Sequence, residues 1–232
     1  MPTTNQTYQS RRDALQVYFD RTAVDGWKKL VSTDKVSRIR QTVREGRDAM
    51  RAHLVSRLPQ DLSGWRILDA GCGSGVLAHA LAARGADVVG IDLSPQMISF
   101  AADKYAGQPL QGSLTFKAGD MLGFDDGHFD AVVAMDSLIH YDLADAAEAV
   151  AHIVAHTRSK IVFTIAPYTP MLGVMHKVGK AFPRSNRSPA VVPTRTEALN
   201  NAVMALCAVP VRPTERITSG FYISQGMEVD LS

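Results

Sequence analysis

The chain has 232 residues, of which 46% are hydrophobic and 21% charged, a composition that supports one sizeable core and excludes disordered and fibrous proteins. The formal net charge of +2 argues against a dedicated nucleic-acid binder. The two cysteines cannot build a disulfide framework and the N-terminus has no apolar signal segment, so we expect a cytoplasmic protein with at most peripheral membrane contact.

Basic residues are concentrated in the first quarter of the chain. Residues 1–60 carry twelve Lys or Arg against six Asp or Glu, which suggests an anionic ligand, an anionic membrane surface or an acidic partner. Apolar side chains recur here at helical spacing, as at Met50 and Leu54, and predict helices over 7–23 and 36–57. We therefore predict that residues 1–60 form an N-terminal helical arm.

From Trp65 onward, short β-forming runs alternate with helical windows. The predicted strands are Trp65–Ala70, Asp87–Asp92, Leu114–Ala118, Phe129–Met135 and Ile161–Ala166. The predicted helices between them are Val76–Arg84, Pro95–Tyr105 and Leu143–His156. This alternation predicts an α/β fold with a parallel sheet that helices cover on both faces.

The alternation stops after the fifth predicted strand. Residues 168–207 look helical but are interrupted by prolines, and the chain closes with a β pair over Val211–Thr218 and Tyr222–Val229. This order predicts a mostly parallel sheet with a C-terminal antiparallel strand. Residues 61–232 should then form one domain, with a segment at about 168–200 as a cap over its cleft.

A glycine-rich turn follows the first predicted strand, in the segment Leu68-Asp69-Ala70-Gly71-Cys72-Gly73-Ser74-Gly75. Its glycines let the backbone turn tightly and approach a ligand closely. The third glycine comes one residue earlier than in the G-x-G-x-x-G turn of dinucleotide enzymes. Asp69 would repel a pyrophosphate but can organise an ammonium group, which favours S-adenosylmethionine over a dinucleotide. Cys72 is interpreted as a loop residue rather than a nucleophile, because no neighbouring His or Lys activates it.

Three further markers follow the next three predicted strands. Asp92 lies 21 residues after Gly71, where an acidic side chain can accept both ribose hydroxyls. Asp120 can accept the adenine amino group, and Met121 can cover the adenine ring. Asp136-Ser137 stands at the strand end where ligands of open α/β sheets bind. The predicted cofactor-binding set is Asp69, Gly71, Cys72, Gly73, Gly75, Asp92, Leu93, Met97, Asp120, Met121, Asp136 and Ser137.

These markers in this order predict a Rossmann-like class I S-adenosylmethionine-dependent methyltransferase. Residues 61–232 would be its S-adenosylmethionine-binding catalytic domain. Methyl transfer would leave S-adenosylhomocysteine as the product of the cofactor.

Several segments carry a closer resemblance. They are Val17–Ala23, Val36–Arg40, Gly46–Asp48, Leu68–Gly75, Asp136–Tyr141 and Ser219–Gln225. Through them the chain resembles the magnesium-protoporphyrin IX O-methyltransferases of bacteriochlorophyll synthesis over nearly its whole length. The resemblance implies methyl transfer to one propionate carboxylate of magnesium protoporphyrin IX, which gives the monomethyl ester. It also suggests handover of the porphyrin from the large subunit of magnesium chelatase.

The residues are compatible with such a substrate. A porphyrin with two propionates needs an apolar slot with a cationic rim, which arginines of the arm and the cap can supply. The predicted substrate-binding residues are Arg38 and Arg40 on the arm, with Arg44 and Arg47 nearby, and Arg184 and Arg187 on the cap. For any single one of these arginines, a solvated helix surface is the alternative.

The chemistry requires little acid–base catalysis. The attacking carboxylate is ionised at neutral pH, since its reference pKa is about 4. What remains is alignment and desolvation of that carboxylate. Chiefly from the family resemblance, His140 and Tyr18 are the predicted catalytic residues, which orient the carboxylate and close over the methyl group.

No protein-bound metal is expected. His152 and His156 share a face of a predicted helix, but no further cluster of ligands in the sequence completes a shell, so the magnesium belongs to the substrate. Two alternatives stay open. One is a methyltransferase acting on another acid or phenol, such as a quinone precursor, and the other is a non-catalytic S-adenosylmethionine-binding assembly factor.

Overall fold

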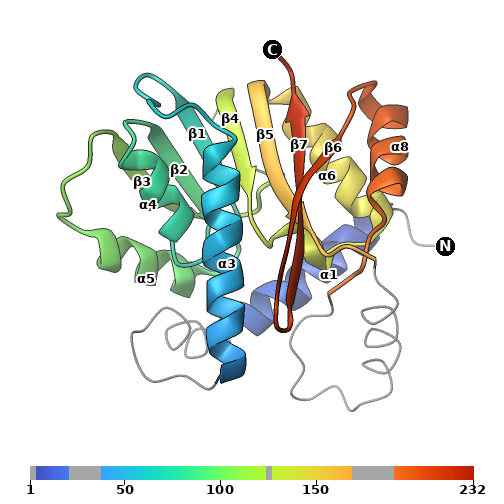
Figure 1. Ribbon diagram of the computed structural model, residues 1–232, viewed down its shortest axis with the longest axis horizontal. Helices are drawn as coiled ribbons and strands as arrows, with labels where there is room; N and C mark the ends of the chain where they lie inside the picture. The colour runs from blue at the N-terminus through green and yellow to red at the C-terminus, as the bar shows by residue number, and fades with distance from the viewer. Residues whose placement is uncertain (1–3, 21–37, 124–126, 169–190) are drawn as a thin grey trace.

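The computed structural model describes residues 4–20, 38–123, 127–168 and 191–232, which fold around a seven-stranded sheet (Figure 1). The strands are β1 (Arg66–Ala70), β2 (Asp87–Asp92), β3 (Ser113–Ala118), β4 (Phe129–Ala134), β5 (Thr157–Ile165), β6 (Arg212–Ser219) and β7 (Tyr222–Asp230). They lie in the order β3-β2-β1-β4-β5-β7-β6, and within this sheet β7 alone runs antiparallel to its neighbours. The predicted fold class, with its C-terminal antiparallel strand, is confirmed.

Helices cover both faces of the sheet. They are α1 (Thr4–Tyr18), α3 (Arg38–Ser56), α4 (Val76–Ala82), α5 (Pro95–Tyr105), the short turn η2 (Leu138–His140), α6 (Leu143–Ala155) and α8 (Thr196–Cys207). In Figure 1, α3 and α4 lie in front of the sheet, whereas α1, α6 and α8 lie behind it. Capping residues fix where α5 and α6 begin: Ser94 Oγ accepts the Met97 N–H at 3.2 Å, and Asp142 accepts the Asp145 N–H at 3.2 Å.

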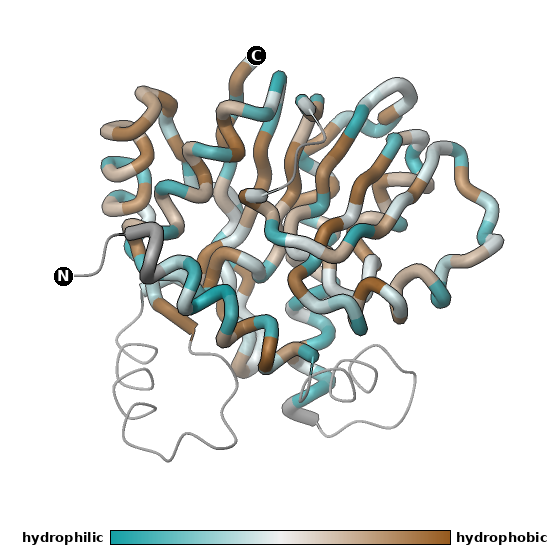
Figure 2. Tube along the Cα trace, turned by 180° about the vertical axis from the view of Figure 1, so that it is seen from behind, coloured by the Kyte–Doolittle hydropathy of each residue, from teal (hydrophilic) through white to brown (hydrophobic). Residues whose placement is uncertain are grey.

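Two apolar layers fill the space between the sheet and its helices. On the face of α3 and α4, the buried residues include Ile67 and Leu81, and on the opposite face they include Phe163 and Val203. Seen from behind, the central strands carry hydrophobic residues along much of their length (Figure 2), as expected for strands that are covered on both faces. This packing fixes the loops that leave the carboxyl ends of the strands.

The two described helices of the first 60 residues lie on opposite faces of the sheet. Met50 and Leu54 of α3 are fully buried, and the helix packs against α4, β6 and β7. α1 packs on α6, and its Tyr8 stacks on Tyr141 with 4.9 Å between the ring centroids. Both helices reach the carboxyl edge of the sheet, where their side chains take part in the site.

Some predicted boundaries differ from those observed. β5 begins at Thr157, four residues before the predicted start at Ile161. Its first residues are polar: Arg158 pairs with Asp130 of β4 at 3.3 Å, and Lys160 pairs with Glu228 and Asp230 of β7 at 3.8 and 3.5 Å. Of the segment 168–207 that was predicted as helical, α8 is observed, whereas 169–190 lie outside the described residues. In the part of the chain that is described, no helix is long and apolar enough to cross a membrane.

Candidate active site

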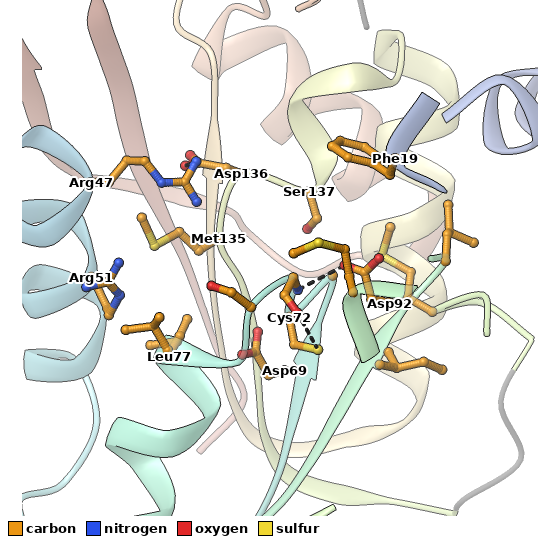
Figure 3. Close-up of a pocket in the computed structure, with 18 of the residues that line it drawn as sticks. Phe19, Arg47, Arg51, Asp69, Cys72, Leu77, Asp92, Met135, Asp136 and Ser137 are labelled. Carbon is orange, nitrogen blue, oxygen red and sulfur yellow. Dashed lines mark hydrogen bonds and ion pairs between the residues drawn. The ribbon is translucent and has the colours of Figure 1, made fainter. Parts of the chain in front are cut away.

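A cavity of about 330 Å³ opens at the carboxyl edge of the sheet, with residues of α1 on one side and of α3 on the other. Its floor comes from the loops that follow successive strands: Gly71–Ser74 after β1, Asp92 and Leu93 after β2, Gly119 and Met121 after β3, and Met135–Ser137 after β4. Figure 3 shows these loops between Arg47 and Phe19. The structure therefore brings parts of all four predicted loops to one cavity.

The glycine-rich turn needs backbone conformations that other residues rarely adopt. Gly71 and Gly73 have φ angles of 81° and 52°. A Cβ on Gly71 would collide with Ser137, whereas a Cβ on Gly73 would meet nothing within 4 Å. The N–H groups of Gly71 and Cys72 donate to the Ile91 carbonyl at 2.8 and 2.9 Å, which ties the turn to β2. A ligand can thus approach the backbone closely at Gly73.

Asp69 lies at the end of β1 and is only 1% exposed. Burial, with a smaller contribution from the charge of Asp92, raises the pKa of its carboxyl to about 7, although the Ala78 N–H and Arg51 act in the opposite direction. Its Oδ2 has no hydrogen-bond partner among the described residues. An unpaired buried carboxylate oxygen is costly, and an ammonium group of a ligand would satisfy it.

Asp92 ends β2 and lines the cavity. One of its carboxylate oxygens accepts the Gly73 N–H and the other accepts the Ser94 N–H, both at 2.9 Å. These two bonds fix the carboxylate and leave lone pairs for further donors, such as ribose hydroxyls. Leu93 and Met97 also line the cavity, as predicted for the cofactor site.

Cys72 sits in the turn with its thiol buried. Burial raises the pKa of this thiol well above its ordinary value, and the charges of Asp69 and Asp92 act in the same direction. A thiol in such surroundings stays protonated at neutral pH. This agrees with the interpretation of Cys72 as a loop residue rather than a nucleophile.

Two residues that were predicted to bind the cofactor do not line the cavity. The carboxylate of Asp120 accepts the Tyr8 hydroxyl at 2.6 Å and pairs with Arg12 at 3.5 Å, so α1 holds it. Its neighbour Met121 does line the cavity. Gly75 precedes α4 with a φ of 73°, and its role in the structure is to start that helix.

Asp136 lines the cavity and also contacts α3. Its φ of 56° is uncommon for a residue other than glycine. Its carboxylate pairs with Arg47 at 3.0 Å and accepts the Tyr222 hydroxyl at 3.1 Å, while its N–H donates to Thr164 Oγ1 at 2.7 Å. The adjacent Ser137 lines the cavity, and its buried Oγ has no hydrogen-bond partner within the described ranges. Asp136 and Tyr222 therefore hold the Arg47 guanidinium at the cavity wall.

The α3 side of the wall contains three arginines, Arg44, Arg47 and Arg51, together with Asp48. Because the arginines are three or four residues apart, one face of the helix presents all of them. Arg51 also pairs with Asp48 at 2.7 Å. Arg51 is not among the residues predicted from the sequence, although its spacing of four from Arg47 was a signal that could have found it.

Of the four arginines in the predicted substrate-binding set, the structure describes the side chain of Arg40 alone, whereas Arg44 and Arg47, named beside that set, line the cavity. Arg40 continues the same face of α3 but is exposed and does not line the cavity. Arg38 begins α3, and its side chain lies outside the described part of the structure. Arg184 and Arg187 lie outside the described residues altogether.

The opposite wall of the cavity is largely apolar and aromatic. Its residues are Leu15, Phe19, His140 and Tyr141. The rings of Phe19 and His140 lie edge to face, with 6.1 Å between their centroids. Tyr18 does not line the cavity, and its ring lies edge-on to Phe19 at 5.4 Å. Of the two predicted catalytic residues, the structure therefore brings His140 into the cavity, and the arm's aromatic there is Phe19.

The two histidines of α6 and its C-cap do not form part of the site. The His156 ring packs on His152 with 4.5 Å between centroids, and its Nδ1 lies 2.8 Å from the His152 carbonyl oxygen. Over the described ranges of the chain, no group of three or more His, Cys, Asp or Glu side chains is arranged to hold a metal ion.

The sheet with its antiparallel seventh strand, and the glycine turn flanked by two acids at the carboxyl edge, occur together in class I S-adenosylmethionine-dependent methyltransferases. The fold and the site place the chain in this class. Its residues fit the cofactor, because the partnerless Oδ2 of Asp69 suits an ammonium group and the fixed carboxylate of Asp92 suits a ribose.

Comparison with known proteins narrows the class to a family. The chain is 47% identical to the magnesium-protoporphyrin O-methyltransferase of Rhodobacter capsulatus, over 95% of this chain and 97% of that protein. It is 30% identical over 76% of its length to the chloroplastic magnesium protoporphyrin IX methyltransferase of Arabidopsis thaliana, of which it spans 58%. The crystal structure of the Synechocystis PCC 6803 magnesium protoporphyrin IX methyltransferase with bound S-adenosylhomocysteine matches with a TM-score of 0.80 and 26% identity, over 95% of this chain and 100% of that one.

Two family models match as well. A methyltransferase domain matches residues 67–160, and the C-terminus of magnesium-protoporphyrin IX methyltransferase matches residues 134–230. The chain belongs to the family of magnesium-protoporphyrin O-methyltransferases.

Proposed function

We propose that this protein transfers a methyl group from S-adenosylmethionine to a propionate carboxylate of magnesium protoporphyrin IX. The products are the monomethyl ester and S-adenosylhomocysteine, and the reaction belongs to chlorophyll or bacteriochlorophyll biosynthesis. The observation that carries the proposal is a single cavity that joins an acid-flanked glycine turn to a wall of arginines. Membership of the family supports the same substrate.

The glycine-turn side of the cavity would hold the cofactor. Asp69 is placed to receive its ammonium group and Asp92 its ribose, while Leu93, Met97 and Met121 offer apolar contacts. When bound, S-adenosylmethionine supplies a methyl group that its sulfonium charge already activates. The protein therefore has to position the carboxylate and keep water away from it.

His140 is the proposed group that orients the reacting carboxylate. It lies on η2 beside Phe19, and its backbone carbonyl accepts the Arg11 side chain at 2.7 Å, so α1 fixes this turn. The nucleophile has already lost its proton, since the reference pKa of a carboxyl is about 4. His140 would thus donate a hydrogen bond rather than remove a proton, and Leu15 and Phe19 would exclude water.

The predicted domain division is part of the proposal. Residues 1–60 would act as the arm of a catalytic domain over 61–232, with a segment at about 168–200 as a cap over the cleft. The polar contacts of α1 with Asp120 and His140 support a role for this helix in closing the site. Tyr18 would act through its edge-on contact with Phe19.

The surroundings of the enzyme follow from its substrate. Magnesium protoporphyrin IX is flat and largely apolar, so direct handover from the large subunit of magnesium chelatase would spare it from water. We place the protein in the cytoplasm, with peripheral contact to the photosynthetic membrane. The basic character of residues 1–60 is consistent with an acidic partner or an anionic surface.

The test is incubation with magnesium protoporphyrin IX and labelled cofactor, followed by chromatography for the labelled ester. Asp92→Ala is the matched loss-of-cofactor control, because it removes hydrogen bonds to a charged acceptor worth about 1.5–3 kcal/mol each. Absence of a Soret shift on porphyrin titration, with methylation of a quinone precursor instead, would contradict the proposal. Cofactor binding without any S-adenosylhomocysteine production would point to a non-catalytic protein.

A further inference from the structure

We infer that Arg47 binds the propionate that is not methylated, and that this contact limits the reaction to a single ester. The inference rests on the proposed function, since it concerns how the same cavity binds the two carboxylates of one porphyrin. It assigns separate tasks to the two walls of the cavity. The His140 side aligns the reacting carboxylate, and the α3 side holds the second one.

Arg47 is held in a fixed position at the cavity wall. Its Nη1 lies 3.0 Å from Asp136 Oδ2, and the side chains of Arg47 and Asp136 are 22% and 7% exposed. Asp136 is held in turn by the Tyr222 hydroxyl and by Thr164. A guanidinium has five N–H donors in a planar fork, so it can hold Asp136 and a substrate carboxylate together. A binding group that is already oriented loses little entropy when the substrate arrives.

The two walls are separated in a way that suits two propionates. Figure 3 shows Arg47 and Phe19 on opposite sides of Ser137, with Asp136 on the Arg47 side. His140 lies beside Phe19 on the far side from α3. A carboxylate at Arg47 and another at His140 therefore occupy different ends of one cavity.

Arg51 is better placed for the cofactor than for the porphyrin. Its charge acts on the buried Asp69 carboxyl at the end of β1, and it pairs with Asp48 at 2.7 Å. The carboxylate of Asp69 and the guanidinium of Arg51 together offer an anionic and a cationic group to the ammonium and carboxylate of S-adenosylmethionine. Arg44 and Arg47 are the other two arginines of this wall, and we assign the substrate carboxylate to Arg47 because Asp136 fixes it at 3.0 Å.

The contact explains why one ester forms and not two. After the first transfer, the remaining carboxylate can react only if the porphyrin turns round, which would bring the new methyl ester to Arg47. An ester oxygen is a neutral acceptor, so it forms a much weaker bond to a guanidinium than a carboxylate does. The reversed orientation of the product is therefore disfavoured by about ten- to a hundredfold.

The experiment compares the binding of magnesium protoporphyrin IX with that of its dimethyl ester, by Soret titration of the full-length protein. The wild type should prefer the diacid. Arg47→Gln should reduce this preference by about tenfold or more and should yield detectable diester on long incubation. Its affinity for S-adenosylhomocysteine should stay within about twofold, which also shows that the variant is folded.

Three further variants sharpen the result. Arg47→Lys keeps the positive charge but lacks the planar guanidinium, so it should retain part of the preference for the diacid over the dimethyl ester. This variant replaces Arg47→Gln in the test if Arg47→Gln fails to fold. Tyr222→Phe should lower the same preference more mildly, because it acts only by positioning Asp136 and Arg47. Arg57→Gln breaks an exposed ion pair to Glu228 beyond the end of α3 and is the matched control, which should behave as the wild type.

An unchanged preference in both Arg47 variants would overturn the inference. A fall in S-adenosylhomocysteine affinity with an unchanged porphyrin preference would also overturn it, because Arg47 would then serve the cofactor. Failure of the wild type to bind either porphyrin would instead contradict the proposed function itself, so the two failures are distinguishable.

Discussion

α1 and α3 both come from residues 1–60 and both reach the cavity, yet they are attached to the molecule to different extents. α3 is held by its apolar side chains, with Met50 and Leu54 fully buried, and turns arginines toward the cavity. α1 buries fewer side chains, Tyr8 and Leu15, against the core on the α6 face, and it adds polar contacts such as the Tyr8 hydroxyl on Asp120. Attachment through a core favours permanence, whereas attachment through a few polar contacts and a small apolar patch favours reversible docking.

This comparison separates two tasks within one site. The charged wall must stay in place if it is to bind an anionic substrate while water is excluded. It therefore belongs on a helix that is part of the core. The apolar wall excludes water but must also open to admit a large substrate. It therefore belongs on a helix that can detach from the rest of the protein, such as α1. The structure is consistent with this division, and three measurements can break or sharpen it.

The largest expected effect is on stability. Leu54→Ala in α3 should lower the free energy of unfolding by about 2–5 kcal/mol, because it leaves a cavity in the core. Leu15→Ala in α1 should cost the whole protein less, since α1 can detach before the rest unfolds. Urea unfolding of the two variants measures the difference, and hydrogen exchange locates it. Equal losses would mean that α1 is as much a part of the core as α3.

The next effect concerns the apolar wall. His140→Ala should lower the rate of methyl transfer by roughly 10- to 1,000-fold, or about 1.4–4 kcal/mol of transition-state alignment. His140→Gln should recover part of the loss by keeping a hydrogen-bond donor, and Tyr18→Phe should be milder because it does not reach the cavity directly. Single-turnover methylation between about pH 6 and 9 measures this. If both His140 variants bound cofactor and porphyrin but were wholly inactive, His140 would be an acid–base catalyst.

The smallest effect concerns Asp69, close to the charged wall. Burial raises its pKa to about 7, and pairing with an ammonium group needs the ionised form. Cofactor affinity should therefore rise by about tenfold from pH 6 to pH 8. The stability of the cofactor-free protein should move the other way, since the contribution of protonated Asp69 is complete below about pH 4 and is lost as the pH rises through 7. Calorimetric titration of the cofactor across this pH range should show the rise in affinity. If the same rise occurred in Asp69→Asn, another group would be responsible for it.

Much of the fold could be predicted because its signals are local. Ser94 and Pro95 mark the start of α5, and the β-forming runs of β1, β2 and β4 are nearly continuous apolar stretches. The start of β5 could not be found in this way. Its first residues are polar: Arg158 pairs with Asp130 of β4, and Lys160 is the first residue in register with β7, whose position follows from a strand order that no local pattern contains.

The parts of the site that lie in one turn of the chain could be predicted from the sequence. The parts where segments distant in sequence meet could be predicted less well. The glycine turn and Asp92 follow from spacing alone. Periodicity also places Arg40 and Arg47 on one face of α3, but it does not say which of them reaches the cavity. That depends on where α3 crosses the sheet, which is set at Gly46, where any Cβ would collide with the Tyr222 ring. The link from Tyr8 to Asp120 spans 112 residues of sequence and carries no local signal.

The position of β7 between β5 and β6 has a consequence for how the protein is made. The last strand of the chain has to enter the sheet between two earlier ones, and α3 packs on β6 and β7 near the opposite end of the sequence. During synthesis, α3 and its neighbour α4 leave the ribosome early, but α3 lacks its contacts with β6 and β7 until most of the chain has followed, a delay of several seconds or more at about 5–20 residues per second. In that interval the apolar face of α3, with Met50 and Leu54, is open to other partners. A chain truncated before β7 would lack Tyr222, whose hydroxyl holds Asp136 and through it Arg47.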